Sequence, residues 1–134
     1  MSAFHLQIVT PDGSAFDGEA EGLRLRTTEG YVSILAGHAD YLAALDIGVV
    51  TVTVDGTAKN AACGGGFLSV EKGEVRLVAT TFEYAETIDL ERAKAAEERA
   101  KQRIAAANEE KEIALARVKL ARALNRISVA EKLS

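Results

Sequence analysis

Four arginines and one aspartate in the last third of the chain have the spacing of a phosphate-binding site. Arg92 and Arg99 are seven residues apart and Arg122 and Arg126 are four apart, so each pair shares one face of a helix. If two such helices fold back antiparallel, the four guanidinium groups converge near Asp89. Guanidinium groups suit phosphate oxygens, and an acid at the edge suits a base or ribose. Charged helix faces are also often simply solvated, so both interpretations stay open.

The other reactive residue types form no catalytic constellation in the sequence. His38 follows a glycine in an expected loop and has no acid–nucleophile set beside it, which favours a structural or interface role. Cys63 is the only cysteine, which excludes a disulfide framework and a cysteine-based zinc site. The three glycines after it are not followed by Lys-Ser/Thr, so they indicate a bulge or tight bend and not a phosphate loop. The sequence therefore predicts a protein that is not an enzyme.

The elements that must position these residues divide the chain into two parts. All 11 glycines and the single proline lie at or before Gly73, and the rest of the chain has neither. Short alternating stretches broken by turn residues predict antiparallel strands in a β-sandwich or barrel over residues 1–86. Residues 87–134 are rich in good helix formers and predict an antiparallel two-helix hairpin that turns at residues 108–110. A single long helix is the alternative, because that turn lacks glycine.

The expected seam between the two helices is made largely of alanine. Apolar residues recur at helical spacing on both helices: Ala93, Ala96, Ala100, Ile104 and Ala107 on the first, and Ile113, Ala116, Leu120, Ala123, Ile127 and Ala130 on the second. Burial of an alanine yields much less free energy than burial of a leucine, at about 25 cal/mol per Å². The hairpin is therefore either a permanent appendage or an arm that a ligand or a competing surface can open.

Charge separates the same two parts. Residues 1–86 carry 5 Lys/Arg against 12 Asp/Glu, a net charge of −7, and residues 87–134 carry 11 against 8, a net charge of +3. This balance favours an acidic protein surface or a nucleotide as the partner of the arm, and disfavours nucleic acid. No basic-then-apolar leader and no apolar run near the ~18 residues of a membrane span is present, so we expect no direct membrane insertion.

Four motifs, in order along the chain, resemble the epsilon subunit of bacterial F-type ATP synthases. They are VTPDG at residues 9–13, EGYVSILAGHA at 29–39, GGFLSV at 65–70 and ALNRISVA at 123–130. The resemblance implies that the β-sandwich docks on the gamma subunit of the central stalk and on the membrane rotor ring. Glu29, Gly30 and His38 of the second motif are the implied partner contacts. The chain would then be peripheral, at the cytoplasmic face of the bacterial plasma membrane.

The resemblance also implies a regulatory role for the helices. The subunit would couple ring rotation to the stalk, and its helices would extend toward the catalytic beta subunits to inhibit ATP hydrolysis. Some similar members bind ATP on the folded hairpin through a motif I/L-D-x-x-R-A, which IDLERA at residues 88–93 matches. The implied ATP contacts are Glu83, Ile88, Asp89, Arg92, Ala93, Arg99, Arg122 and Arg126. ATP would be a regulatory ligand that needs no metal. Two alternatives stay open: the same role without nucleotide, and an adaptor with a coiled-coil arm outside any synthase.

Overall fold

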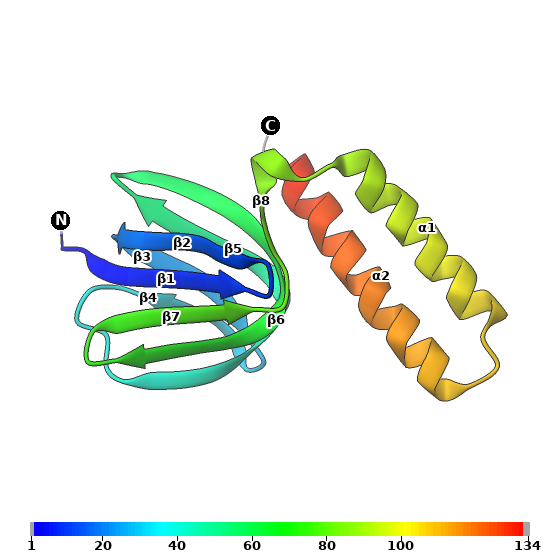
Figure 1. The fold of residues 1–134 in the computed structure, drawn as a ribbon, viewed down its shortest axis with the longest axis horizontal. Coiled ribbons are helices and arrows are strands. Elements are labelled where there is room, and N and C mark those ends of the chain that lie inside the picture. Colours follow the sequence, from blue (N-terminus) through cyan, green and yellow to red (C-terminus); the bar gives the residue numbers. More distant parts are fainter. Residues whose placement is uncertain (1, 133–134) are drawn as a thin grey trace.

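The computed structural model describes residues 2–132 and places a folded β-sheet beside a pair of helices (Figure 1). The strands are β1 (Phe4–Thr10), β2 (Gly13–Ala20), β3 (Gly22–Thr27), β4 (Gly30–Ile34), β5 (Tyr41–Val54), β6 (Thr57–Glu71), β7 (Glu74–Ala79) and β8 (Phe82–Tyr84). A 3₁₀ turn, η1 (Ala85–Thr87), leads to the helices α1 (Leu90–Ala106) and α2 (Glu110–Glu131). The predicted order of a β-sandwich followed by a helical hairpin is confirmed.

The sheet has the strand order β2-β1-β7-β6-β5-β3-β4, with β8 paired to β6. It folds over into two layers (Figure 1) around one core of inward-facing side chains. Alternation builds this core, because every second residue of β3, of β7 and of β1 as far as Ile8 is buried. The pairing of β1 with β7 is parallel, which the sequence-based expectation of antiparallel strands did not include.

Strands β5 and β6 are much longer than the short strands expected, at 14 and 15 residues. On the side away from β5, β6 pairs with β8 as far as Cys63 and with β7 from Gly66 onward. Its neighbouring strand therefore changes across the glycine triplet. Gly65 and Gly66 have φ of +101° and +138°, which confirms a bend. The register with β5 does not shift across this segment, since Leu45 pairs with Gly66 and Ile47 with Gly64, so the triplet is not a bulge. A Cβ on Gly66 would collide with the carbonyl oxygen of Val78, and only glycine fits there.

The two helices form the hairpin that the alanine seam predicts. Asp89 caps α1, and its Oδ1 accepts a hydrogen bond from the backbone N–H of Arg92 at 3.1 Å. Every residue of the predicted seam is buried or half-buried. The chain leaves helical geometry between Ala106 and Glu110, which excludes the single long helix.

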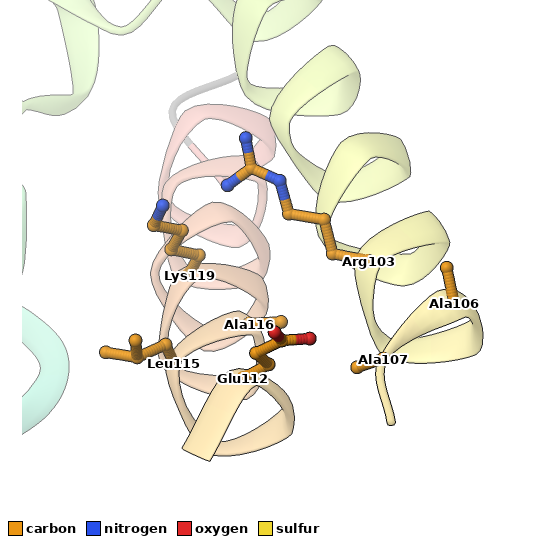
Figure 2. A pocket seen from close by; sticks show the side chains of 7 residues that line it. All are labelled: Arg103, Ala106, Ala107, Glu112, Leu115, Ala116 and Lys119. Carbon is orange, nitrogen blue, oxygen red and sulfur yellow. The ribbon is translucent and has the colours of Figure 1, made fainter. Parts of the chain in front are cut away.

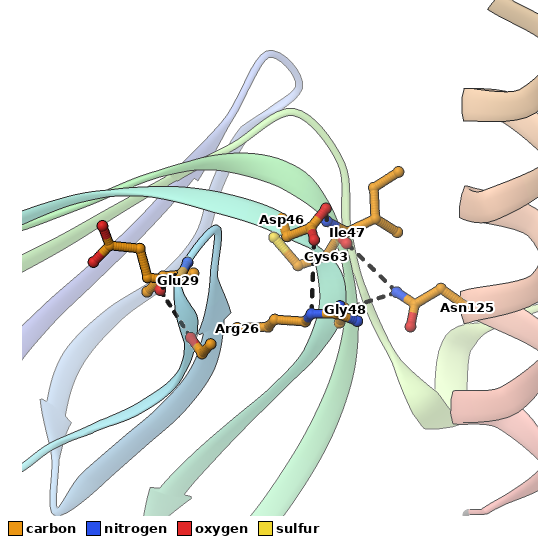
Figure 3. Close-up of polar contacts among 9 residues, drawn as sticks. Arg26, Glu29, Asp46, Ile47, Gly48, Cys63 and Asn125 are labelled. Atoms are coloured by element: carbon orange, nitrogen blue, oxygen red, sulfur yellow. Dashed lines mark hydrogen bonds and ion pairs between the residues drawn. The ribbon is translucent and has the colours of Figure 1, made fainter. Parts of the chain in front are cut away.

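α2 lies between the sandwich and α1, and it contacts β5 and β6 (Figure 1). Val129 is buried against Ala62 and Ala85. Nδ2 of Asn125 donates to the carbonyl oxygens of Gly48 at 2.9 Å and Cys63 at 3.4 Å (Figure 3). The sequence left open what the hairpin packs against, and these contacts fix it to the long β5–β6 pair.

Candidate functional site

A polar cleft of about 440 Å³ lies where α1 and the end of α2 meet β8 and the β1–β2 turn. It is lined by Thr10, Asp12, Thr81, Phe82, Glu83, Thr87, Ile88, Asp89, Arg92, Ala93, Ala96, Arg99 and Arg126. Seven of the eight residues predicted as ATP contacts are among these lining residues. A volume of this size is typical of small-molecule sites, which run from about 300 to 1,000 Å³.

Three elements bring the polar groups of this cleft together. The capped start of α1 fixes Asp89 and Arg92 beside each other. Arg126 of α2 forms an ion pair with Glu83 of β8, with 2.8 Å between Nε and Oε1. Both partners are partly exposed, so this pair contributes modestly to stability. It ties the end of the hairpin to the last strand, and so the cleft exists in this form only while the hairpin is docked.

Arg122 does not lie with Asp89 in the polar cleft, although the sequence predicted that all four arginines would converge there. It lies one helical turn before Arg126, and its Nε donates to the carbonyl oxygen of Gly64 at 3.3 Å. A Cβ on Gly64 would collide with Thr81 and approach that same Nε, so the glycine makes room for the arginine. Arg122 therefore lines the neighbouring cavity and not the polar cleft.

The neighbouring cavity, the cationic groove, has about 350 Å³ and runs between the two helices. Its lining residues are Thr81, Ala96, Arg99, Ala100, Arg103, Lys119, Arg122 and Arg126. Figure 2 shows Arg103 from α1 and Lys119 from α2 on facing helices, with their nitrogen atoms directed away from the hairpin turn. Sequence reasoning missed both cations. Their spacing could have indicated them: Arg103 follows Arg99 by four residues and Lys119 precedes Arg122 by three, so each shares a helix face with a predicted contact.

The residues predicted as partner contacts lie on two consecutive loops of the sandwich. Glu29 lies in the β3–β4 turn and Gly30 begins β4, with a φ of +124° that favours glycine. His38 follows β4, its Nδ1 donates to the carbonyl oxygen of Ala39 at 2.7 Å, and its ring meets Tyr41 edge to face. Their contact with a partner stays a prediction.

The other histidine takes part in a cluster that sequence reasoning did not find. The ring of His5 on β1 bridges Asp17 of β2 and Glu74, the first residue of β7, with 2.6 Å on each side. The hydrogen bond with Asp17, followed by that with Glu74, raises the pKa of His5 to about 9. By contrast, burial raises the pKa of the Cys63 thiol, so this cysteine is an inert part of the core.

Residues 2–132 contain no group of three or more His, Cys, Asp or Glu side chains placed to hold a metal ion. Neither helix of the described part is long and apolar enough to cross a membrane.

Comparison with known proteins assigns both parts of the chain to one class. Residues 3–85 match the β-sandwich domain of the ATP synthase delta/epsilon chain, and residues 86–131 match its long α-helix domain. The chain therefore belongs to the ATP synthase delta/epsilon chain family. It is 41% identical over 130 residues to the ATP synthase epsilon chain of Bacillus velezensis, covering 97% of this chain and 98% of that one. It is 40% identical to that of Bacillus subtilis, covering 98% and 100%.

Solved structures share the fold at lower identity. A chain of the Euglena gracilis mitochondrial ATP synthase superposes with a TM-score of 0.80 at 22% identity, over 100% of this chain and 83% of that one. A chain of the Tetrahymena thermophila mitochondrial ATP synthase central stalk and c-ring gives 0.66 at 15% identity, over 94% and 95%. Family membership confirms the resemblance seen in the sequence and the prediction of a non-catalytic ATP synthase subunit. It also removes the adaptor outside any synthase from consideration.

Proposed function

We propose that this chain is a rotor subunit that couples rotation of the membrane ring to the central stalk of a bacterial ATP synthase. The sandwich, over residues 1–86, would dock on the gamma subunit and the ring, with Glu29, Gly30 and His38 among the contacts. The family membership and the bacterial relatives support this proposal. The structural relative in a central stalk and c-ring assembly adds support from the fold. The subunit would then lie at the cytoplasmic face of the plasma membrane, as a peripheral component.

The helical hairpin, over residues 87–134, is proposed to act as a mobile inhibitory arm. The buried side chains of its seam are mainly alanines, so its two helices hold together with little apolar area. Its net charge of +3 suits an acidic surface on the catalytic beta subunits when the arm extends. Extension would block ATP hydrolysis, and docking on β5 and β6 would release the block.

ATP is the proposed ligand of the docked hairpin, and one observation carries this proposal. Seven of the eight residues that the resemblance to the family implies as ATP contacts line a single cleft of ligand size. The cleft combines arginines for phosphate with carboxylates for a base or ribose. Its lining residues come from α1, α2 and β8, so a ligand that contacts all three binds only the docked arm. Binding then stabilises the docked arm by RT ln(1 + [ATP]/Kd), and a fall in ATP would favour extension.

Calorimetric titration of the full chain with ATP, ADP and GTP tests the nucleotide proposal. We expect saturable binding of ATP that Arg99→Gln weakens by about tenfold, the effect of one lost charge-assisted hydrogen bond. Arg99 lines both cavities, and it makes no ion pair within the described residues. Arg117→Gln on the exposed face of α2 is the matched control and should bind ATP as the natural chain does. No heat at millimolar ATP would favour the alternative, a coupling and inhibitory arm without a nucleotide ligand.

A further inference from the structure

A separate cavity of ligand size, the sandwich cavity, lies between β2 and the β5–β6 hairpin. It has about 510 Å³, within the range of about 300 to 1,000 Å³ that small-molecule sites occupy. Strands β2, β5, β6 and β8 and the turn η1 contribute its lining residues: Ala15, Phe16, Val52, Val54, Asp55, Thr57, Lys59, Tyr84 and Glu86. None of these residues lines the polar cleft or the cationic groove, so the sandwich cavity is a distinct space.

The inner wall of the sandwich cavity is apolar. Ala15 and Phe16 of β2 pack on the hydrophobic core, as does Val54 of β5. Val52 of β5 is itself part of that core, and Tyr84 of β8 adds an aromatic ring to the wall. β2 and β5 are not neighbours in the strand order, so the folding of the sheet brings them together. Such a wall favours the apolar body of a ligand, because removal of apolar surface from water is favourable.

The exposed rim of the sandwich cavity carries one carboxylate without a counter-charge. Lys59 and Glu86 form an ion pair, with 3.4 Å between Nζ and Oε1. Asp55, in the β5–β6 turn, forms no ion pair within residues 2–132. The Tyr84 hydroxyl adds no charge, since burial, followed by the Glu86 carboxylate, raises its pKa. The unbalanced carboxylate favours a cationic head group over an anionic one.

The segment 83–86 is a wall that the sandwich cavity shares with the docked arm. Two of its residues, Glu83 and Ala85, contact α2 through an ion pair and through buried apolar packing. The alternate residues, Tyr84 and Glu86, line the sandwich cavity. Figure 1 shows β8, where this segment begins, between the sandwich and α2. Release of the arm therefore removes contacts that hold one wall of the cavity in place.

We propose that the sandwich cavity binds a small organic cation, with an apolar body against β2 and β5 and an ammonium group beside Asp55, and that its occupancy favours docking of the arm. The apolar wall and the unbalanced carboxylate support this class of ligand. The shared segment 83–86 supports the link to the arm. Only the link rests on the proposed function, because it requires an arm that opens; the binding itself requires neither a mobile arm nor a nucleotide.

Titration of the full-length natural chain, followed by two-dimensional amide NMR, tests the site. The probe is 4-phenylbutylammonium, and 4-phenylbutanol and 5-phenylvalerate carry the same body with a neutral and an anionic head group. Asp55→Asn removes the carboxylate, and asparagine tolerates the φ of +50° at this position. Ala15→Leu fills the cavity from β2. Glu19→Gln removes an exposed carboxylate of β2 that lies outside the cavity, and it is the matched control.

We expect the amides around the cavity to shift saturably, with a Kd of about 1 mM for the cation and about threefold weaker binding of the alcohol. The anion should bind more weakly still. Asp55→Asn should abolish the preference for the cation over the alcohol, and Ala15→Leu should weaken both by about threefold or more. Glu19→Gln should bind all three probes as the natural chain does. The site is overturned if no saturable shift occurs at the cavity, or if Asp55→Asn and Glu19→Gln have the same effect.

Amide hydrogen exchange with the same cation tests the link to the arm. At ten times Kd, a ligand that binds only the docked form should slow exchange through opening of the arm by about tenfold in α1 and α2. Unchanged exchange in an arm that opens separately from the sandwich overturns the link and leaves the site standing. If α1 and α2 exchange only together with β7, the arm does not open by itself. The proposed mobile arm then fails and the link fails with it, while the titration still decides the site.

Discussion

Removal of the Asn125 side-chain amide tests whether the hairpin is held to the sandwich by a few identifiable contacts. The amide donates at 2.9 Å to the carbonyl oxygen of Gly48 and at 3.4 Å to that of Cys63 (Figure 3). A typical hydrogen bond within a protein contributes a net ~0.5–1.5 kcal/mol, and the longer of these two lies at the weak end of that range. Asn125→Ala should therefore destabilise docking of α2 by about 1–2 kcal/mol, since both contacts exist only in the docked state.

The expected consequence is a larger population of the open arm and an unchanged sandwich. A loss of 1–2 kcal/mol corresponds to a factor of about 5 to 30 in the opening equilibrium. Limited trypsin digestion measures this population when closing is fast relative to cleavage. Cleavage within residues 90–132 should then accelerate by about the same factor, while cleavage within the strands keeps its rate.

Gln102→Ala removes an equivalent amide from the exposed face of α1 and is the matched control. It should digest at the rate of the natural chain. The reasoning is refuted if Asn125→Ala digests like this control. Equal acceleration in the arm and the strands would also refute it, because the two parts would then open together and α2 would not be a separately released element.

Three further predictions concern single positions. His5→Gln should lower the melting temperature below pH 6.5, where the natural chain holds the full benefit of the raised pKa. The difference between the two chains should shrink as pH rises through about 9, where His5 loses its proton in the folded state; a pH-independent difference contradicts the cluster. Asp89→Ala should cost the helix cap about 1 kcal/mol and speed amide exchange in the first turn of α1, whereas Asp89→Asn should largely preserve it. Gly66→Ala should destabilise the sandwich in chemical denaturation far more than Gly56→Ala, because only Gly66 abuts the backbone of another strand.

Local patterns sufficed for the parts of the fold that neighbours in sequence determine. Alternation indicated β1, β3, β7 and the end of β5, the spacing of alanines gave the seam, and an acid before an apolar run gave the cap at Asp89. The same spacing rules brought Arg92, Arg99 and Arg126 to one cleft. These features depend on the 2.0 and 3.6 periods of single elements, which the sequence carries directly.

Contacts between distant elements were beyond the reach of these patterns. The parallel pairing of β1 with β7 joins residues about 70 apart, and no local signal specifies it. β6 is longer than the short strands expected: its Ala61–Gly66 stretch lacks the branched and aromatic residues typical of strands, yet pairing on both sides keeps it extended. Asp12 lines the cleft from the β1–β2 turn, and Arg122 donates a hydrogen bond to the carbonyl oxygen of Gly64 on β6. Tertiary packing decided each of these positions.

Amide hydrogen exchange of the full chain with and without ATP tests the central claim most directly, because it reports the stability of the arm and the sandwich separately. At an ATP concentration of 100 times Kd, binding restricted to the docked hairpin contributes about 2.7 kcal/mol. Amides of α1 and α2 that exchange through opening of the arm should then exchange about 100-fold more slowly, with no change in β3 and β4. Equal exchange of the arm with and without millimolar ATP would contradict the claim that ATP holds the arm in its docked state.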